Sequence, residues 1–414
     1  MKKSSQRALA QGAAVLLIIV AIIAFVIGGA AVYFLMPAPE VTVEVPKTVR
    51  FGCMWMSPAA ATCWCSATQI AIDKLEARYP DVLETSIIKE EVGPEDTNTF
   101  AKAMIADGAD IIIANAEYMA MPLADIYADY PDVYFLGNIA GDISRGRNWI
   151  RYFTREYQAV YLAGIVAGAL TETNNIGMVG SFKCAQVCRR INAFALGIQE
   201  VNPDATLYVL WVGDWYVPAK EKEVAETLID TYNVDVMTQQ TDSPSASTVA
   251  ADNDIWFIGK DTDYIAAGWG TGATIATSFA MRWDVIWERI LKDYLVGNDH
   301  PRNLYFIGME EPLYVAEGRV VSVDLISADK AGVDSISSEA EAAIKAKSTA
   351  LWNDVTDLVD TKREAIISGM WDPFMEEIID KETGEVLYAE GVMPTDEALL
   401  TEEYFIPGIE APAA

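Results

Sequence analysis

Histidine is nearly absent from this sequence: the 414 residues contain one, His300. Histidine is the side chain most often used as a general acid or base in enzymes, and it is a common metal ligand. The chain also lacks the Gly-x-Ser-x-Gly motif of serine hydrolases and the Walker-type phosphate loop. We therefore predict that the protein is not an enzyme and that it uses neither a metal nor another cofactor.

Basic residues are scarce beside acidic ones. Lys and Arg together number 30 and Asp and Glu number 60, so the formal net charge is −30. A strongly anionic surface repels phosphate backbones, and we predict that nucleic acid is not a partner. Solubility alone explains such an excess, which therefore identifies no partner by itself.

Charged residues are missing altogether from 13–36, a run long enough as a helix to cross a hydrocarbon core of roughly 30 Å. Three basic residues precede it, and such flanks stay on the cytoplasmic side. The run exceeds the apolar core of a cleaved signal, which has about 7 to 15 residues. We predict a retained membrane anchor at 1–36 in preference to a cleaved signal, then a proline-bounded spacer at 37–47. The remainder, with a net charge of −33, is expected to lie outside the cell.

Cysteine is also sparse, with five residues: Cys53, Cys63, Cys65, Cys184 and Cys188. Outside the cytosol thiols oxidise readily, but an odd number leaves at least one unpaired. We predict disulfides of Cys53 with Cys63 or Cys65, and of Cys184 with Cys188. A thiolate metal site remains an alternative, although the spacing is not that of a zinc module. In our interpretation, oxidation tethers the segment 62–66 (TCWCS), which then presents its indole to a ligand.

Runs of β-branched residues alternate with helical patterns along the rest of the chain. The first series predicts strands and helices in turn at 48–54, 70–79, 85–88, 99–106 and 109–114. The second predicts them at 157–170, 175–180, 189–201, 206–212, 219–232, 234–238 and 254–259. Such alternation indicates βαβ units, here in two parallel-sheet lobes. Ligands of these sheets bind beyond the carboxyl ends of the strands, in loops expected to hold Trp64, Cys184, Trp215, Asp242 and Asp261.

Several motifs, in one order, resemble a known family. They are 161–168 (YLAGIVAG), 190–197 (RINAFALG), 201–204 (VNPD), 215–223 (WYVPAKEKE), 241–244 (TDSP), 259–263 (GKDTD) and 366–374 (IISGMWDPF). The sequence resembles, from about 49 to about 408, the basic membrane protein family. Its members are extracytoplasmic substrate-binding proteins of ABC transporters that capture purine nucleosides or purine bases. The stretch 215–223 is most similar to the adenine-binding branch.

The resemblance implies a type I periplasmic-binding fold, in which two lobes joined by three hinge crossings trap a ligand between them. It places 48–153 and 275–313 in the first lobe, and 154–274 and 314–414 in the second. The implied function is capture of a purine base or nucleoside and its delivery to an ABC permease. With the predicted anchor, the protein would be held at the cell membrane with its bulk outside.

The resemblance also implies which residues bind the ligand. Trp64 and Trp215 match aromatic residues that stack on the base from opposite lobes, a contact worth ~1 to 3 kcal/mol per base. Asp242 and Asp261 match acids that accept hydrogen bonds from the base or from ribose, and Asn115 is placed to reach the base edge. Core packing for the tryptophans and helix capping for the acids remain open.

Two further residues match the family at this site, and the sequence departs from the family pattern at three places. Asn192 and Trp283 match family positions, but helix packing explains them equally well. Relatives have Gly-Asp-Gly-Gly where this chain has Ala-Ala-Thr-Cys at 60–63, and an aromatic-rich turn where it has Glu-Tyr-Met at 117–119. Lys260 replaces an apolar or aromatic residue. The identity of the ligand therefore stays open.

Two other classes of function stay open. A surface-layer or filament-forming structural protein could use the same fold, with the anchor and acidic shell serving assembly. A nucleoside hydrolase could use carboxylates beside a bound nucleoside to activate water.

Overall fold

The computed structural model describes residues 48–412 except 139–145, 298–301 and 316–317. The predicted anchor at 1–36 and spacer at 37–47 lie outside the described residues. In the part of the chain that is described, no helix is both long and apolar enough to cross a membrane.

The first lobe is built on a parallel sheet whose strand order is β11-β5-β4-β3-β1-β2. Its strands are β1 (Val49–Met54), β2 (Leu83–Lys89), β3 (Ile111–Ala114), β4 (Tyr134–Gly137), β5 (Trp149–Thr154) and β11 (Leu304–Ile307). Its helices are α2 (Cys63–Arg78), α3 (Thr97–Ala106), α4 (Glu117–Leu123) and α9 (Trp283–Leu295). Strand β3 is buried along its whole length, as expected for the inner strand of a parallel sheet that is covered on both faces.

Helix α2 begins earlier than its sequence pattern predicts. The pattern starts at residue 70, but the helix starts at Cys63, and the Thr62 hydroxyl accepts a hydrogen bond from the Cys65 amide at 3.4 Å. The amides of the first helical turn have no carbonyl acceptor within the helix, and the threonine hydroxyl at this position supplies an acceptor for one of them. Trp64 therefore lies in the first turn of α2, and the prediction that it lies in a loop is wrong.

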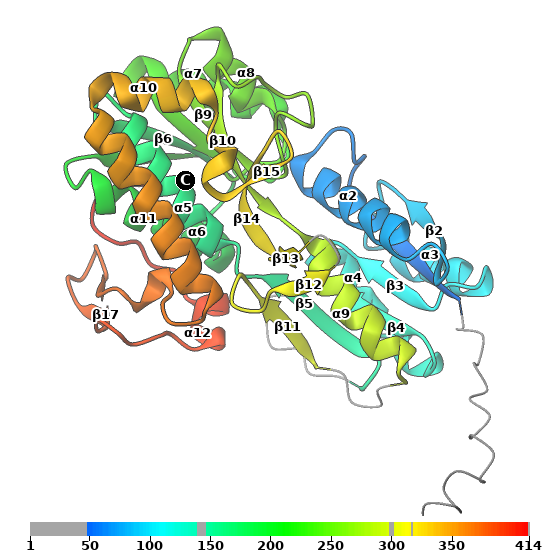
Figure 1. The fold of residues 1–414 in the computed structure, drawn as a ribbon. Coiled ribbons are helices and arrows are strands. Elements are labelled where there is room, and N and C mark those ends of the chain that lie inside the picture. The colour runs from blue at the N-terminus through cyan, green and yellow to red at the C-terminus, as the bar shows by residue number, and fades with distance from the viewer. Residues whose placement is uncertain (1–47, 139–145, 298–301, 316–317, 413–414) are drawn as a thin grey trace, which may run out of the picture. The chain divides into compact units, whose positions relative to one another are not determined.

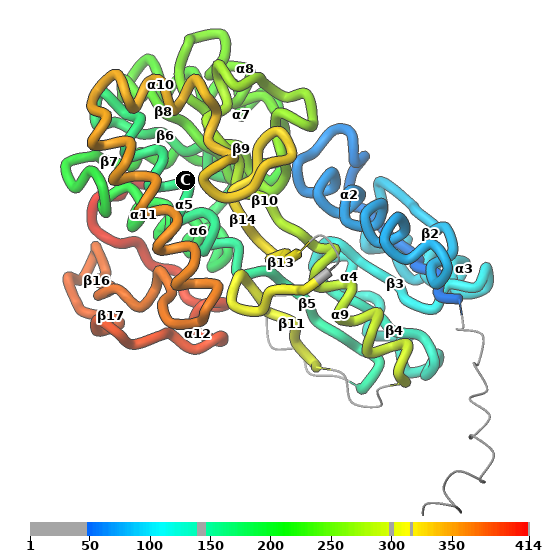
Figure 2. Tube along the Cα trace, viewed as in Figure 1, coloured from blue at the N-terminus to red at the C-terminus, as the bar shows by residue number. Residues whose placement is uncertain are grey.

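The second lobe is built on a sheet of order β15-β14-β10-β9-β8-β6-β7-β18. Its inner strands are parallel: β6 (Asn175–Gly180), β7 (Thr206–Trp211), β8 (Val236–Gln239), β9 (Trp256–Asp261) and β10 (Ile275–Met281). At one edge β14 (Val323–Ser327) and β15 (Lys330–Ala331) run antiparallel. At the other, β18 (Ile409–Glu410) pairs with β7, and Figure 2 shows this return of the C-terminal end.

Among the helices of the second lobe, one is completely buried. They are α5 (Tyr157–Leu170), α6 (Ala185–Val201), α7 (Pro218–Tyr232), α8 (Ser245–Asp252), α10 (Ser338–Lys347), α11 (Thr349–Ile367) and α12 (Asp396–Thr401). Every residue of α5 is buried, and its bounds are those that the sequence predicts. Gly164 and Gly197 let α5 and α6 approach closely, since a Cβ at Gly197 would lie 2.0 Å from the Tyr161 carbonyl oxygen.

The remaining described elements are small. They are the hairpin of β12 (Leu313–Val315) and β13 (Gly318–Val320), the pair β16 (Ile378–Ile379) and β17 (Val386–Tyr388), and three short 3-10 helices at Tyr127–Asp129, Gly332–Ser335 and Pro373–Met375.

Along the described residues the chain passes between the two sheets three times: from β5 to α5, from β10 to α9, and from β11 to β14. The second passage falls later than the sequence predicts. We expected the first lobe to resume at residue 275, but β10 pairs with β9 and β14, so residues 275–281 belong to the second sheet. A run of buried residues predicts that a segment forms a strand, but it does not predict which sheet the strand joins.

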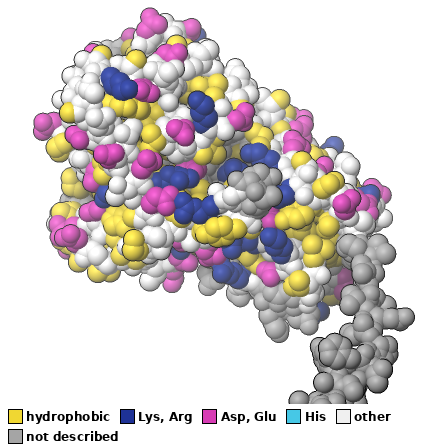
Figure 3. Space-filling view, in the orientation of Figure 1, with side chains coloured by type: hydrophobic (Ala, Val, Ile, Leu, Met, Phe, Trp, Pro, Cys, Tyr) yellow, Lys and Arg dark blue, Asp and Glu magenta, His cyan; other side chains and the backbone are white. Residues whose placement is uncertain are grey.

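The surface in Figure 3 carries acidic side chains dispersed among basic and apolar ones. Several of the charges pair locally, such as Lys222 with Glu226 at 3.7 Å. On this face the acidic excess therefore forms part of a mixed, solvated surface, which agrees with the interpretation that it serves solubility.

Candidate functional site: a cleft between the lobes

A cleft of about 790 Å³ lies between the two lobes. The first lobe contributes Met56, Trp64, Asn115, Ala116, Glu117, Tyr118, Met121, Asn138 and Phe153. The second contributes Phe182, Cys184, Ala185, Gln186, Trp215, Asp242, Lys260, Leu400, Thr401 and Glu403. Most of these residues end or follow a strand of one of the two sheets, so both sheets present their carboxyl ends to the cleft.

Trp64 lies on the wall of the cleft contributed by the first lobe. Its indole packs edge-on against Trp283, with ring centroids 5.4 Å apart, and tilted against Phe153 at 6.4 Å. The indole N–H donates to the carbonyl oxygen of Asn115 at 2.7 Å. The side chain is 7% exposed, and this remaining surface contributes to the cleft. Trp64 is thus a rigid apolar surface held from behind.

The Asn115 side chain is occupied within the first lobe. Its Oδ1 accepts from the Met56 amide at 3.0 Å, and its Nδ2 lies 3.4 Å from Cys65 Sγ and 3.3 Å from Thr68 Oγ1. The predicted hydrogen bond from this side chain to a base edge would break contacts already made. In the structure Asn115 supports Trp64 through its carbonyl oxygen.

Asn138 lies beside Asn115, after the neighbouring strand β4, and was not predicted. The side chain is 5% exposed, and its Nδ2 has no acceptor in hydrogen-bond geometry among the described residues. Burial raises the pKa of Tyr152, and the nearby Asn138 amide opposes that rise. Because an amide carries two N–H groups, at least one N–H of Asn138, a residue that lines the cleft, has no acceptor among the described residues.

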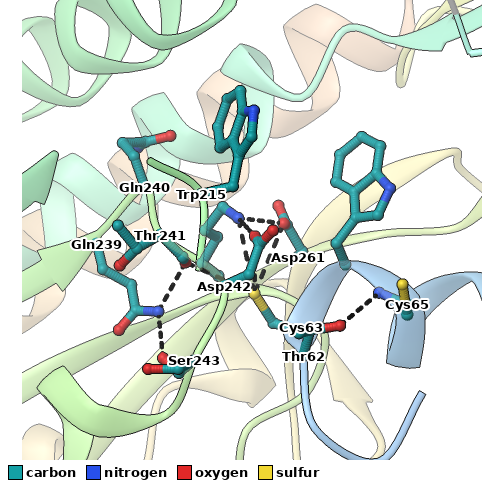
Figure 4. A network of polar contacts seen from close by, with 12 residues as sticks. Thr62, Cys63, Cys65, Trp215, Gln239, Gln240, Thr241, Asp242, Ser243 and Asp261 are labelled. Atoms are coloured by element: carbon teal, nitrogen blue, oxygen red, sulfur yellow. Dashed lines mark hydrogen bonds and ion pairs between the residues drawn. The ribbon is translucent and has the colours of Figure 1, made fainter. Parts of the chain in front are cut away.

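Trp215 faces the same cleft from the second lobe. It packs edge-on against Phe182, with ring centroids 4.8 Å apart, and it is only half-buried. Its carbonyl oxygen accepts from the Asp242 amide at 2.8 Å, which joins the loop after β7 to the loop after β8. Gln239 shapes the second of these loops, because its Nε2 donates to the carbonyls of Thr241 and Ser243 (Figure 4).

Asp242 and Asp261, both labelled in Figure 4, share one buried lysine, Lys260. The Lys260 ammonium lies 2.5 Å from Asp242 Oδ1 and 2.6 Å from Asp261 Oδ2, and its side chain is 1% exposed. Burial disfavours the ammonium, but the two carboxylates outweigh this and raise the pKa of Lys260 above its usual value. Lys260 is therefore charged and compensates part of the charge of the acidic pair.

The structure separates the roles of the two acids. Asp242 and Lys260 line the cleft, whereas Asp261 is fully buried behind them and 3.3 Å from the Arg190 guanidinium. Asp261 ends β9 with φ of 64°, and a hydrogen bond from the Thr262 amide to the Lys260 carbonyl closes this turn at 2.7 Å. Asp261 holds the side chains of Lys260 and Arg190 in place, and Asp242 is the acid that reaches the cleft. The expectation that Asp261 lies in a loop is wrong, since it ends a strand.

All five cysteines are free, so the predicted disulfides are wrong. The Cys63 thiol lies 3.7 Å from Asp242 Oδ1 in the second lobe, while the Cys65 thiol lies 3.2 Å from Ser57 Oγ in the first. The two thiols point to opposite lobes because they flank Trp64 in one helical turn. Cys184 is the residue before α6 and Cys188 lies one turn into it, and Cys53 is buried in β1. A hydroxyl cap and packing, not oxidation, fix the segment 62–66.

Cys63, Asp242 and Asp261 are close enough for their ligand atoms to lie within 4.8 Å of one another. The Lys260 ammonium already contacts both carboxylates and lies 3.6 Å from Cys63 Sγ. A cation there would meet this ammonium at close range, so we assign no metal to the cluster.

Asn192 and Trp283 lie away from the cleft. The Asn192 amide binds the C-terminal segment, donating to the Tyr404 carbonyl at 3.0 Å and accepting from the Ile406 amide at 3.2 Å. Trp283 is fully buried and supports Trp64. Both residues therefore have the packing roles that the sequence left open.

Comparison with known proteins decides the family. The family described as ABC transporter substrate-binding protein PnrA-like (Bmp) matches residues 67–306, more than half of the chain. The chain belongs to the Bmp family. The resemblance inferred from the sequence motifs is thereby confirmed, and the protein is an ABC transporter solute-binding protein.

Two relatives and one solved structure are similar to this Bmp protein. A purine-binding protein of Brucella abortus is 26% identical over 394 residues, covering 95% of this chain and 99% of the relative. A protein of Haloferax volcanii, named as a glucose-binding protein of an ABC transporter, is 36% identical over 213 residues. That match covers 51% of this chain and 53% of the relative, so the chain spans about half of its length. A solute-binding protein from Conexibacter woesei matches with a TM-score of 0.58 at 18% identity, covering 78% of this chain and 98% of the other.

The solved structure supports the fold alone, and it agrees with the predicted periplasmic-binding architecture of two parallel-sheet lobes. Within this fold the cleft residues that the sequence analysis missed include Asn138, Phe153, Phe182 and Glu403. The first three end or follow a strand, and that position is a signal the sequence contains. Glu403 follows α12 near the end of the chain, and nothing local in the sequence marks it as a cleft residue.

Proposed function

We propose that this Bmp protein captures a purine base or nucleoside in the cleft and delivers it to an ABC permease. The observation that carries the proposal is the placement of Trp64 and Trp215, one from each lobe, on the wall of one cleft. Flat indoles bind flat heterocycles by stacking, and each stacked base gains ~1 to 3 kcal/mol. The full-length similarity to a purine-binding protein supports the same ligand class.

The polar groups of the cleft suit a heterocycle that both donates and accepts hydrogen bonds. Asp242 offers carboxylate oxygen to an amino group, a ring N–H or a ribose hydroxyl. Asn138 offers an N–H to a ring nitrogen or a carbonyl oxygen. Asn115 lines the cleft, but its side-chain amide is bonded within the first lobe. Asp261 supports Lys260 from behind.

We further propose that the anchor predicted at 1–36 holds the protein at the cell membrane with the cleft outside. The uncharged run at 13–36 and the basic residues before it support this placement. An assembly-forming structural protein and a nucleoside hydrolase are the competing functions. Particle sizing of the detergent-solubilised chain tests the first, and incubation with adenosine followed by a search for free base tests the second.

Residues 48–414 are expected to bind adenine or a purine nucleoside with a Kd of about 1 μM or lower, about −8 kcal/mol. Calorimetry with a panel of purines, pyrimidines and glucose measures this. Glucose is included because the Haloferax relative is named for it. Preference for glucose, or equal millimolar binding to the whole panel, would reject the purine proposal.

Asn138→Ala is expected to weaken purine binding about tenfold with little change in stability. The Asn138 amide has an N–H free for a ligand, and leaving its ligand acceptor unpaired costs ~1 to 3 kcal/mol. Asn115→Ala is the matched variant from the adjacent strand, and it should lower the melting temperature because its amide is fully bonded. If Asn138→Ala melts early and binds purine normally, the assignment of a ligand contact is wrong.

A further inference from the structure

Cys63 belongs to the first lobe by sequence and to the second lobe by contact. It is the first residue of α2, yet it is fully buried and packs in an apolar cluster with second-lobe residues such as Val179, Tyr264 and Ile275. Its backbone amide donates to the carbonyl oxygen of Asp242 at 3.0 Å. The start of α2 is therefore inserted into the opposite lobe.

The thiol of Cys63 ends among the charged groups of the second lobe (Figure 4). Its sulfur lies 3.6 Å from the Lys260 ammonium, 3.7 Å from Asp242 Oδ1 and 3.8 Å from Asp261 Oδ2. A neutral thiol is a weak donor and a weak acceptor, so it fits beside both the cation and the anions without adding charge. Burial raises the pKa of Cys63, which keeps the thiol neutral in this position.

Three successive residues of α2 therefore point in three directions. Cys63 enters the second lobe, Trp64 lines the cleft, and Cys65 contacts Ser57 and Asn115 of the first lobe. Asp242, which Cys63 binds, lines the same cleft as Trp64. One peptide segment thus links the proposed stacking surface of one lobe to the proposed polar contact of the other.

We propose that Cys63 is a positioning residue for ligand capture, which docks into the second lobe when the cleft closes and sets Trp64 against Asp242. The inference rests on the proposed function, because it needs lobes that separate to admit a ligand. Separation must withdraw Cys63 from its apolar cluster and break its bond to the Asp242 carbonyl. Docking therefore favours the closed arrangement, and a ligand that favours closure protects the thiol.

Alkylation of the unsubstituted protein by iodoacetamide tests the proposal, and mass spectrometry of its peptides distinguishes Cys63 from Cys184, the half-buried thiol on the cleft wall. Mass spectrometry follows Cys63 with and without saturating adenine. We expect Cys63 to react in the free protein and to react at least tenfold more slowly with adenine. Cys65, equally buried but held inside the first lobe, is the matched control and should stay unreactive in both states.

The outcomes separate this inference from the proposed function. If Cys63 is as unreactive as Cys65 in the free protein, or reacts equally with and without bound adenine, the positioning role is wrong even though purine binding stands. If calorimetry detects no purine binding, the proposed function fails, and the comparison of Cys63 with Cys65 in the free protein still decides whether the docked residue is released.

Substitution gives a second readout. Cys63→Ala should raise the dissociation rate of adenine about tenfold with a smaller effect on association, and the closer mimic Cys63→Ser should recover part of the loss. A purely structural role would lower the melting temperature of both variants and leave the dissociation rate unchanged, which would also contradict the proposal.

Discussion

Lys260→Met is expected to lower the free energy of unfolding by about 3 to 5 kcal/mol. The ammonium of Lys260 lies within 2.6 Å of carboxylate oxygens of both Asp242 and Asp261, and all three side chains are nearly inaccessible to water. Removing one partner of a buried ion pair leaves an uncompensated charge in a medium of low polarity, which costs this amount. Two such carboxylates would remain, with Arg190 nearest to Asp261.

Urea denaturation of Lys260→Met and of the parent measures this loss. Lys222→Met is the control, because Lys222 pairs with Glu226 at an exposed site, and such pairs contribute about 0 to 1 kcal/mol. Adding Asp242→Asn to Lys260→Met removes one of the stranded charges and should restore part of the stability. A loss below about 1 kcal/mol in Lys260→Met would show that the charge network is not a stabilising unit.

The pH range of this contribution follows from the direction of the shift. The pKa of Lys260 is raised in the folded state, so the amine holds its proton more tightly there than in the unfolded chain. Its stabilising effect is complete below the unfolded value of about 10.4 and is lost only as the pH rises through the folded value. Neutral buffer is therefore the correct condition for the comparison.

Trp64→Ala is expected to weaken purine binding at least tenfold. The indole is the flat apolar surface of the first lobe in the cleft, and loss of one stacked base contact costs ~1 to 3 kcal/mol. The same change removes packing against Trp283 and Phe153 and the hydrogen bond to Asn115. Truncating a buried tryptophan costs about 3 to 5 kcal/mol of stability, so binding must be measured where the variant is folded.

Two controls isolate the stacking contribution. Trp64→Phe keeps an aromatic face and should retain most of the affinity, although it loses the bond to Asn115. Trp371→Ala removes an indole that packs on Tyr161 in the second lobe and is not among the residues that line the cleft. Calorimetry should find its affinity unchanged. Equal affinity of Trp64→Ala and the parent would end the assignment of Trp64 to the ligand.

The sequence predicted the architecture well because a parallel sheet leaves a periodic pattern in the chain. The bounds of α5 were predicted without error, and β6 also lies where its pattern placed it. What a local pattern omits is the partner of each strand. The seven buried residues of β10 therefore gave no sign that this strand joins the second sheet.

The site was predictable in outline and uncertain in detail. Trp64, Trp215 and Asp242 all reach the cleft because each lies near the carboxyl end of a strand. The partners of a side chain are invisible in sequence, so the sequence did not show that Asp261 is buried behind Lys260. Nor did it show that the amide of Asn115, which does line the cleft, is bonded within the first lobe. The predicted disulfides failed for a related reason, since spacing along α2 does not reveal that Cys63 and Cys65 face opposite lobes.

The fully buried helix α5 has a consequence for how the chain is made. One of the helices that cover it, α11, begins at Thr349, almost 180 residues after α5 ends at Leu170. During synthesis, this apolar helix with no polar face stays incompletely covered until most of the remaining chain has left the ribosome. A nascent chain that stops before α11 would therefore expose an apolar, aggregation-prone surface. Its solubility would depend on chaperones rather than on its own stability.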